Sequence, residues 1–194
     1  GELADRHMSY VLLIRDYLQN PDKASETRLR YNFVSPWSKL IRSEFLSKNG
    51  IVFDEIIAAN DVLFSVKVGY LMKKFDATDE TIYCITRSKG SLTVNYSHDV
   101  FDARLDAFIR SYQYLSSRID ARDFRYLHMS GFTMVSRSIS MGLGLRKAIS
   151  VYSELRKHNV RIFDKRYLNP FFIGNKIIEY IRRHLLLRRL TTTK

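Results

Sequence analysis

Hydrophobic residues recur at three- and four-residue intervals along much of this sequence, which is the spacing of an amphipathic helix. The clearest series follows Asp99 and contains Phe101, Leu105, Phe108, Ile109, Tyr112 and Leu115. Later series contain Ile149, Tyr152 and Leu155, and then Phe172, Ile173, Ile177, Tyr180 and Ile181. The pattern therefore predicts a helical second half whose apolar stripes face a core.

The first half is predicted to be more varied. A short helix is expected over 10–18, closed by Asn20-Pro21, and it leads into a charged connector over 22–30. A second helix is expected to begin at Pro36 and to end at Asn49-Gly50, with one apolar face made of Leu40, Ile41, Phe45 and Leu46. A third is expected from Asn60-Asp61 to about Tyr70.

Two short extended runs follow that third helix. Residues 80–86 and 91–94 are strand-like, and the turn residues 87–90 separate them, so this segment is the best β-hairpin candidate of the chain. The predicted fold class is α+β and mostly helical, with a β-hairpin and a C-terminal helical region.

Charge divides the chain unevenly. The net charge is +12, and residues 135–194 hold 14 Lys and Arg against 3 Asp and Glu, so nearly all the excess lies in the last third. The other 134 residues carry a net charge of only +1, so a nearly neutral body precedes a basic tail. We predict two units, one over residues 1–96 and a basic helical region over residues 97–194.

Composition excludes several classes of protein. The single cysteine, Cys84, excludes an internal disulfide and lies in an apolar run typical of a small buried side chain. The sequence has no apolar run of membrane-spanning length, and its polar first residues do not resemble a signal peptide. We expect a cytoplasmic protein, and the leading Gly1 suggests a piece of a longer one.

Three blocks between Tyr31 and Thr93 together resemble the acceptor-side segment of family 2 glycosyltransferases, of the kind found in bacterial polysaccharide and capsule synthesis. These blocks are SPWSKLIRSEFLSKNGIVFDE, ANDVLFSVKVGY and ETIYCITRSKGSLT, and they cover about a third of the chain. Their order and spacing agree with the family's pattern. The resemblance implies a GT-A fold in the intact enzyme and inverting transfer from a nucleotide-sugar to a saccharide or lipid-linked acceptor.

The resemblance implies a catalytic role for Asp61. Asn60-Asp61 matches the family's Glu-Asp motif, whose Asp is taken as the base that deprotonates the acceptor hydroxyl. A helix N-terminus would stabilise the ionised carboxylate. The structural alternative is that Asp61 only caps its helix. Asn60 replaces the usual Glu, so a second carboxylate function is in doubt.

Other candidate residues have two interpretations each. Trp37 could stack on a sugar at the acceptor site or anchor a core. Lys39 could meet a phosphate or an acidic acceptor, or it could be a solvated lysine. Arg87, Ser88 and Lys89 match a turn that lies near the donor phosphates in the resembled enzymes, or they form a solvated hairpin tip.

The donor half of such an enzyme is missing from this sequence. It has no Asp-x-Asp motif and no strand followed by a Gly-rich turn and a helix. We therefore expect Mn²⁺ or Mg²⁺ to act only in the intact enzyme, and we predict no metal site here. The chain alone is expected to be inactive, and an apolar face left open by the missing half could drive self-association.

The C-terminal stretch is both basic and apolar. Five residues of it, Lys176, Arg182, Arg183, Arg188 and Arg189, could contact an anionic membrane surface and place the protein at the inner face of the membrane. The same stretch could instead pack on the body of the protein. Binding to nucleic acid is disfavoured because no nucleic-acid motif accompanies the charge. The alternative to an enzyme is a non-catalytic basic helical module that binds membrane lipid or nucleic acid.

Overall fold

The computed structural model describes residues 2–3, 7–82, 86–87, 97–164, 167, 169–171 and 173–174. Most of these residues are helical, which confirms the mostly helical fold class. The described helices are α1 (His7–Gln19), α2 (Lys23–Asn32), α3 (Ser43–Lys48), α4 (Asn60–Leu71), α5 (His98–Ser116), α6 (Ala121–Tyr126), α7 (Phe132–Ser140) and α8 (Gly144–Lys157). Within the described residues, no helix is both long and apolar enough to cross a membrane.

The predicted β-hairpin is wrong. Within the described residues, Thr86–Arg87 (β2) pair antiparallel with Glu2–Leu3 (β1), near the start of the sequence. Residues 80–82 are not in a strand, and the proposed return arm at 91–94 lies outside the described residues. A local pattern can predict an extended segment, but the choice of pairing partner is a tertiary property.

The segment expected to be a charged connector is α2. Asp22 accepts a hydrogen bond from the backbone N–H of Ser25 (2.7 Å), and Ser25 Oγ is 3.1 Å from the Asp22 N–H, so the two residues form a reciprocal cap. Ser25, Thr27 and Leu29 form the buried side of the helix. Because Ser25 and Thr27 are polar, the buried side of α2 does not appear as an apolar stripe in the sequence.

The helix predicted from Pro36 is shorter than expected. Residues 36–39 form a turn, in which the Lys39 N–H donates to Pro36 O (3.1 Å), and α3 begins only at Ser43. Leu40 is fully exposed and not part of a core face. Tertiary contacts of this segment override its helical pattern, because the buried Ser35 side chain donates a hydrogen bond to Tyr10 Oη on α1 (2.9 Å).

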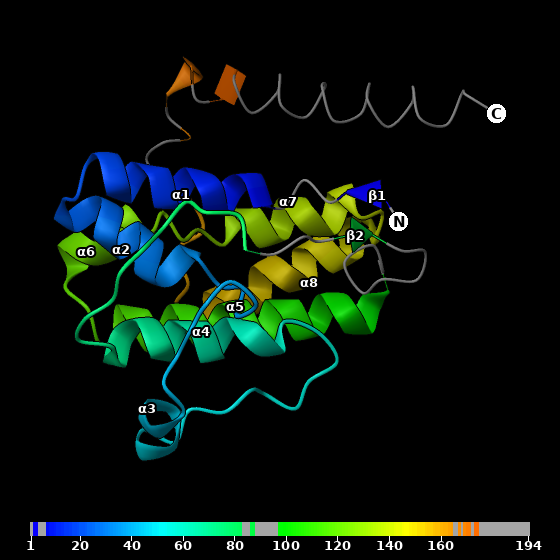
Figure 1. Ribbon diagram of the computed structural model, residues 1–194. Helices are drawn as coiled ribbons and strands as arrows, with labels where there is room; N and C mark the ends of the chain where they lie inside the picture. Colours follow the sequence, from blue (N-terminus) through cyan, green and yellow to red (C-terminus); the bar gives the residue numbers. More distant parts are fainter. Residues whose placement is uncertain are drawn as a thin grey trace.

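Three apolar clusters hold the helices together. The largest joins α5, α7 and α8 around Phe101, Val151 and Leu155. The second joins α3 to α4 through Ile51, Phe64 and Val68. In the third, Val66 of α4 meets Leu115 of α5 and Leu127. Figure 1 shows α4 and α5 side by side, with α3 projecting beyond them. The division predicted near residue 96 stays a prediction, and the third cluster crosses it.

Helices α2 and α4 approach very closely at Gly69. A Cβ atom added at Gly69 would lie 2.4 Å from the carbonyl oxygen of Arg30. The Arg30 guanidinium donates to Gly69 O (3.0 Å) and Met72 O (2.8 Å), and it also bonds Glu26 Oε1 (2.6 Å). Arg30 thus fastens α2 to the C-terminal end of α4, where the last carbonyls of a helix lack partners.

We predict that Gly69→Ala destabilises the protein by about 1–3 kcal/mol, because the added methyl group meets backbone that cannot move without shifting a helix. Replacing a glycine inside a helix by alanine ordinarily stabilises a protein. A destabilising effect at Gly69 would therefore point to the close contact. Urea unfolding would measure it. Gly174→Ala is the control, since a Cβ at Gly174 meets nothing within 4 Å. Equal or greater stability of Gly69→Ala would contradict the close contact.

Candidate functional site

The N-terminal end of α4 is the first part of the candidate site. The chain reaches it through the loop 51–59, where Ala59 takes a left-handed conformation (φ 62°) and the Asp54 N–H donates to Asn60 O (3.2 Å). Ala59 is the N-cap residue, and no side chain forms a capping hydrogen bond there. Asn60 is exposed and Asp61 is half-buried in the first turn. Asp61 therefore does not cap its helix in the way the structural alternative required.

An ion pair that sequence reasoning missed holds this loop in place. Arg110 Nη2 of α5 lies 3.0 Å from Asp54 Oδ2, and Arg110 Nε donates to Asp106 Oδ2 (2.7 Å). Burial alone would lower the pKa of Arg110, but the two carboxylates raise it above its ordinary value. The i, i+4 spacing of Asp106 and Arg110 was visible in the sequence, whereas the link to Asp54 depends on the packing of α5.

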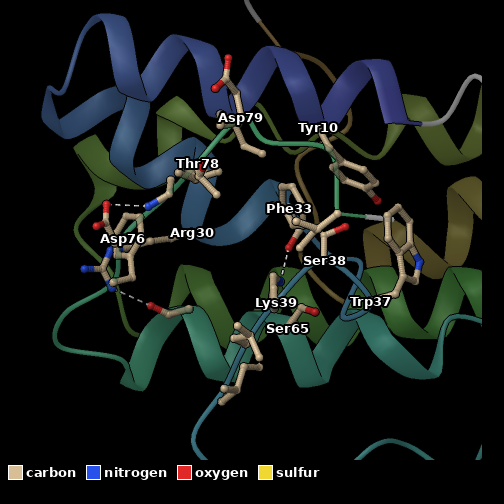
Figure 2. A pocket seen from close by; sticks show the side chains of 18 of the residues that line it. Tyr10, Arg30, Phe33, Trp37, Ser38, Lys39, Ser65, Asp76, Thr78 and Asp79 are labelled. Atoms are coloured by element: carbon tan, nitrogen blue, oxygen red, sulfur yellow. Dashed lines mark hydrogen bonds between the residues drawn. The ribbon is translucent and has the colours of Figure 1, made fainter. Parts of the chain in front are cut away.

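A cavity of about 610 Å³ is the second part of the site. It lies between α1, α2, α4 and the segment that follows α4 (Figure 2). Apolar and aromatic side chains form much of its wall, and these include Tyr10, Val11, Ile14, Leu29, Phe33, Trp37, Ile41, Val68, Met72, Phe75 and Ile82. Its size falls in the range that holds a small organic ligand or a sugar.

Lys39 lies in the wall of the cavity and interacts electrostatically with Asp61. Its ammonium group lies in the cavity wall, donates to the carbonyl of Phe33 and sits 5.2 Å from the centre of the Phe33 ring. Burial lowers the pKa of Lys39 to about 8, and the negative charge of Asp61 opposes that shift. Lys39 is thus not the solvated helix lysine that was one of the two interpretations. Asp61 itself is not among the residues that line the cavity.

Trp37 packs against α1 and also lines the cavity. It lines the cavity, and its ring packs edge-on against Tyr10 at a centroid distance of 5.9 Å. Tyr10 in turn contacts the Phe33 ring at 4.5 Å. In Figure 2, Phe33 and Lys39 lie near the centre of the view, with Tyr10 and Trp37 to their right. The half-buried Trp37 therefore anchors α1 and still presents part of its surface to the cavity.

The remaining predicted site residues are not brought to this cavity by the described structure. Arg87 is described only as backbone of β2, and Ser88 and Lys89 lie outside the described residues. The basic C-terminal residues Lys176, Arg182, Arg183, Arg188 and Arg189 also lie outside them. Sequence reasoning missed Tyr10, Arg30 and Phe75, which come to the cavity from three different segments.

The described residues contain no group of three or more His, Cys, Asp or Glu side chains that could hold a metal ion. We assign these residues no metal-dependent step.

Comparisons with protein-family models, with curated proteins and with solved structures give no match to this chain. The candidate site consequently rests on its own geometry and on the resemblance of its sequence blocks.

We predict that stability rises with pH between about 7.5 and 9.5 because of Lys39. The pKa of Lys39 is about 8 in the folded protein and about 10.5 in the unfolded chain. In this window Lys39 therefore binds more protons in the unfolded state, and stability rises with pH. The expected gain is about 2 kcal/mol. Burial raises the pKa of Tyr31 and of Tyr114 in the folded protein. These two tyrosines therefore lower the stability as the pH rises above this window.

Urea unfolding of the wild type and of Lys39→Met across this window measures the effect. The difference in unfolding free energy, wild type minus variant, should increase with pH. Parallel curves would show that Lys39 titrates as an ordinary exposed lysine.

Proposed function

We propose that this chain is the acceptor-side portion of an inverting glycosyltransferase, with Asp61 as the catalytic base. The intact enzyme would move a sugar from a nucleotide-sugar to a saccharide or lipid-linked acceptor. The observation that carries the proposal is the position of Asp61. It is half-buried in the first turn of α4, it makes no capping hydrogen bond, and its charge acts on Lys39 in the cavity wall.

This position suits a general base. The partial positive charge at the N-terminal end of α4 favours the ionised carboxylate. In the proposed reaction the acceptor hydroxyl gives its proton to Asp61 while its oxygen attacks the anomeric carbon, and the bond from that carbon to the nucleotide phosphate breaks. Lys39 would then stabilise negative charge on the acceptor side, because its ammonium is largely protonated below its pKa of about 8.

The cavity supports the acceptor assignment. Its aromatic wall of Tyr10, Phe33 and Trp37 offers ring faces and edges of the kind that pack against sugar rings. Its further apolar wall would equally accommodate the lipid part of a lipid-linked acceptor. In this proposal Asn60 contacts the acceptor from the exposed side of α4, and Arg87, Ser88 and Lys89 contact the donor phosphates. The metal ion would be held by residues that this sequence does not contain.

We predict that Asp61→Asn abolishes transfer in the intact enzyme, because the amide cannot accept the proton of the acceptor hydroxyl. A loss of about 10²–10⁴-fold in the transfer rate is expected. Initial rates with saturating donor would measure it, and circular dichroism would verify that the variant is folded. A transfer rate equal to that of the wild type would contradict the assignment of Asp61 as the catalytic base.

The matched control is Glu44→Gln. It removes an exposed carboxylate from the first turn of another helix, α3, and therefore reproduces the loss of a charge at a helix N-terminus without touching the candidate site. Its transfer rate should equal that of the wild type.

We also predict that this chain alone binds nucleotide-sugars poorly. Calorimetric titration with UDP-sugars and GDP-sugars in the presence of Mn²⁺ should give no binding heat, because the sequence lacks the donor-binding elements. Clear binding would show that a donor site exists within this chain and that the acceptor-side assignment is wrong.

A further inference from the structure

One predicted helix face lies on the outside of the protein. The sequence pattern placed Ile149 and Tyr152 with Leu155 on one apolar stripe, but the buried residues of α8 are Ala148, Val151 and Leu155. Ile149 and Tyr152 are exposed at 58% and 46%. Helix α8 thus has two apolar sides, one in the core and one open to solvent.

The open side of α8 carries a row of three apolar side chains. Leu145, Ile149 and Tyr152 are four and three residues apart and therefore lie in one row along α8. Ile139, at the end of α7, is also exposed, and a short turn through Gly142 (φ 73°) joins the two helices. Together Ile139, Leu145, Ile149 and Tyr152 form what we call the α7–α8 face. Leu145 is the most exposed of them at 71%.

Basic residues border this face. Residues 132–157 contain five Lys and Arg and a single acidic residue, Glu154. Arg146 follows Leu145 directly, and Arg156 lies one helical turn after Tyr152, both with exposed side chains. Lys147 is instead paired with Asp102 (2.6 Å), and Lys157 lies 3.7 Å from Glu154. The apolar row is therefore accompanied by Arg146 and Arg156, with net positive charge around it.

We propose that the α7–α8 face binds an anionic lipid surface. Leu145, Ile149 and Tyr152 would enter the boundary between headgroups and acyl chains, while Arg146 and Arg156 meet lipid phosphates. An amphipathic helix that lies in a membrane interface combines an apolar row with basic residues beside it in this way. The attraction of each basic residue to anionic headgroups adds to the burial of apolar surface.

Charge favours lipid over the other occupants of such a face. A second copy of this chain would bring like charges together around the apolar row. A nucleic acid would satisfy the arginines but would leave Leu145 and Ile149 against phosphates and water. This surface uses other residues than the C-terminal basic stretch, and it does not depend on the catalytic role proposed for Asp61.

The test measures partition of the full chain onto sedimented vesicles of phosphatidylcholine, with and without phosphatidylserine. The double variant Leu145→Ser/Ile149→Ser removes two of the three apolar side chains of the row without opening the core, since both are exposed. Its affinity for the anionic vesicles should fall by about tenfold or more. Arg146→Gln/Arg156→Gln should reduce the preference for anionic over neutral vesicles.

The matched control is Leu12→Ser/Leu18→Ser, which removes two similarly exposed leucines from α1 and should bind vesicles as the wild type does. Urea unfolding of each variant would verify that the fold is intact. Wild-type affinity of Leu145→Ser/Ile149→Ser would overturn the proposal. So would a result in which that variant abolishes self-association, or binding to duplex RNA, while vesicle binding is unchanged.

Discussion

The close contact between α2 and α4 at Gly69 is the constraint on which the candidate site depends. It brings the backbone of α2 against α4 with no room for a side chain, and the Arg30 guanidinium spans the junction by binding two carbonyls near the end of α4. The cavity lies against this junction, since Arg30, Gly69 and Met72 all contribute to its wall. This contact and the two apolar clusters that include α4 together fix the direction of the helix, with Asp61 at its opposite end.

Asp61 and Lys39 place opposite charges in the two parts of the candidate site. Asp61 lies at the N-terminal end of α4, where the helix dipole favours negative charge, and Lys39 lies in an apolar wall that disfavours its positive charge. Arg110 adds support from α5 through Asp54, so the loop that precedes Asp61 is tied to the body of the protein. In the proposed transferase this arrangement would keep the base in place while an acceptor enters the cavity.

The errors of the sequence-based interpretation have specific physical causes. Helix α2 was read as a connector because its buried side is made of Ser25, Thr27 and Leu29, which do not form an apolar stripe, although its capping pair is visible in the sequence. The predicted hairpin failed because β2 pairs with a distant segment. On α8, apolar residues at helical spacing were assigned to a core, but the helix has two apolar sides and only packing decides which is buried. The exposed apolar side of α8 is the surface that we propose binds lipid.

The sequence by itself determined the helical character of the protein, the core face of α5, the approximate bounds of α4 and the concentration of positive charge in the last third. These are local properties, set by the spacing of side chains along the chain and by composition. Only the tertiary structure decided that Tyr10, Arg30, Trp37 and Lys39 share one cavity, that Asp54 pairs with Arg110, and that Ile149 faces solvent. Such contacts join residues far apart in sequence, and a single sequence carries no periodic signal for them.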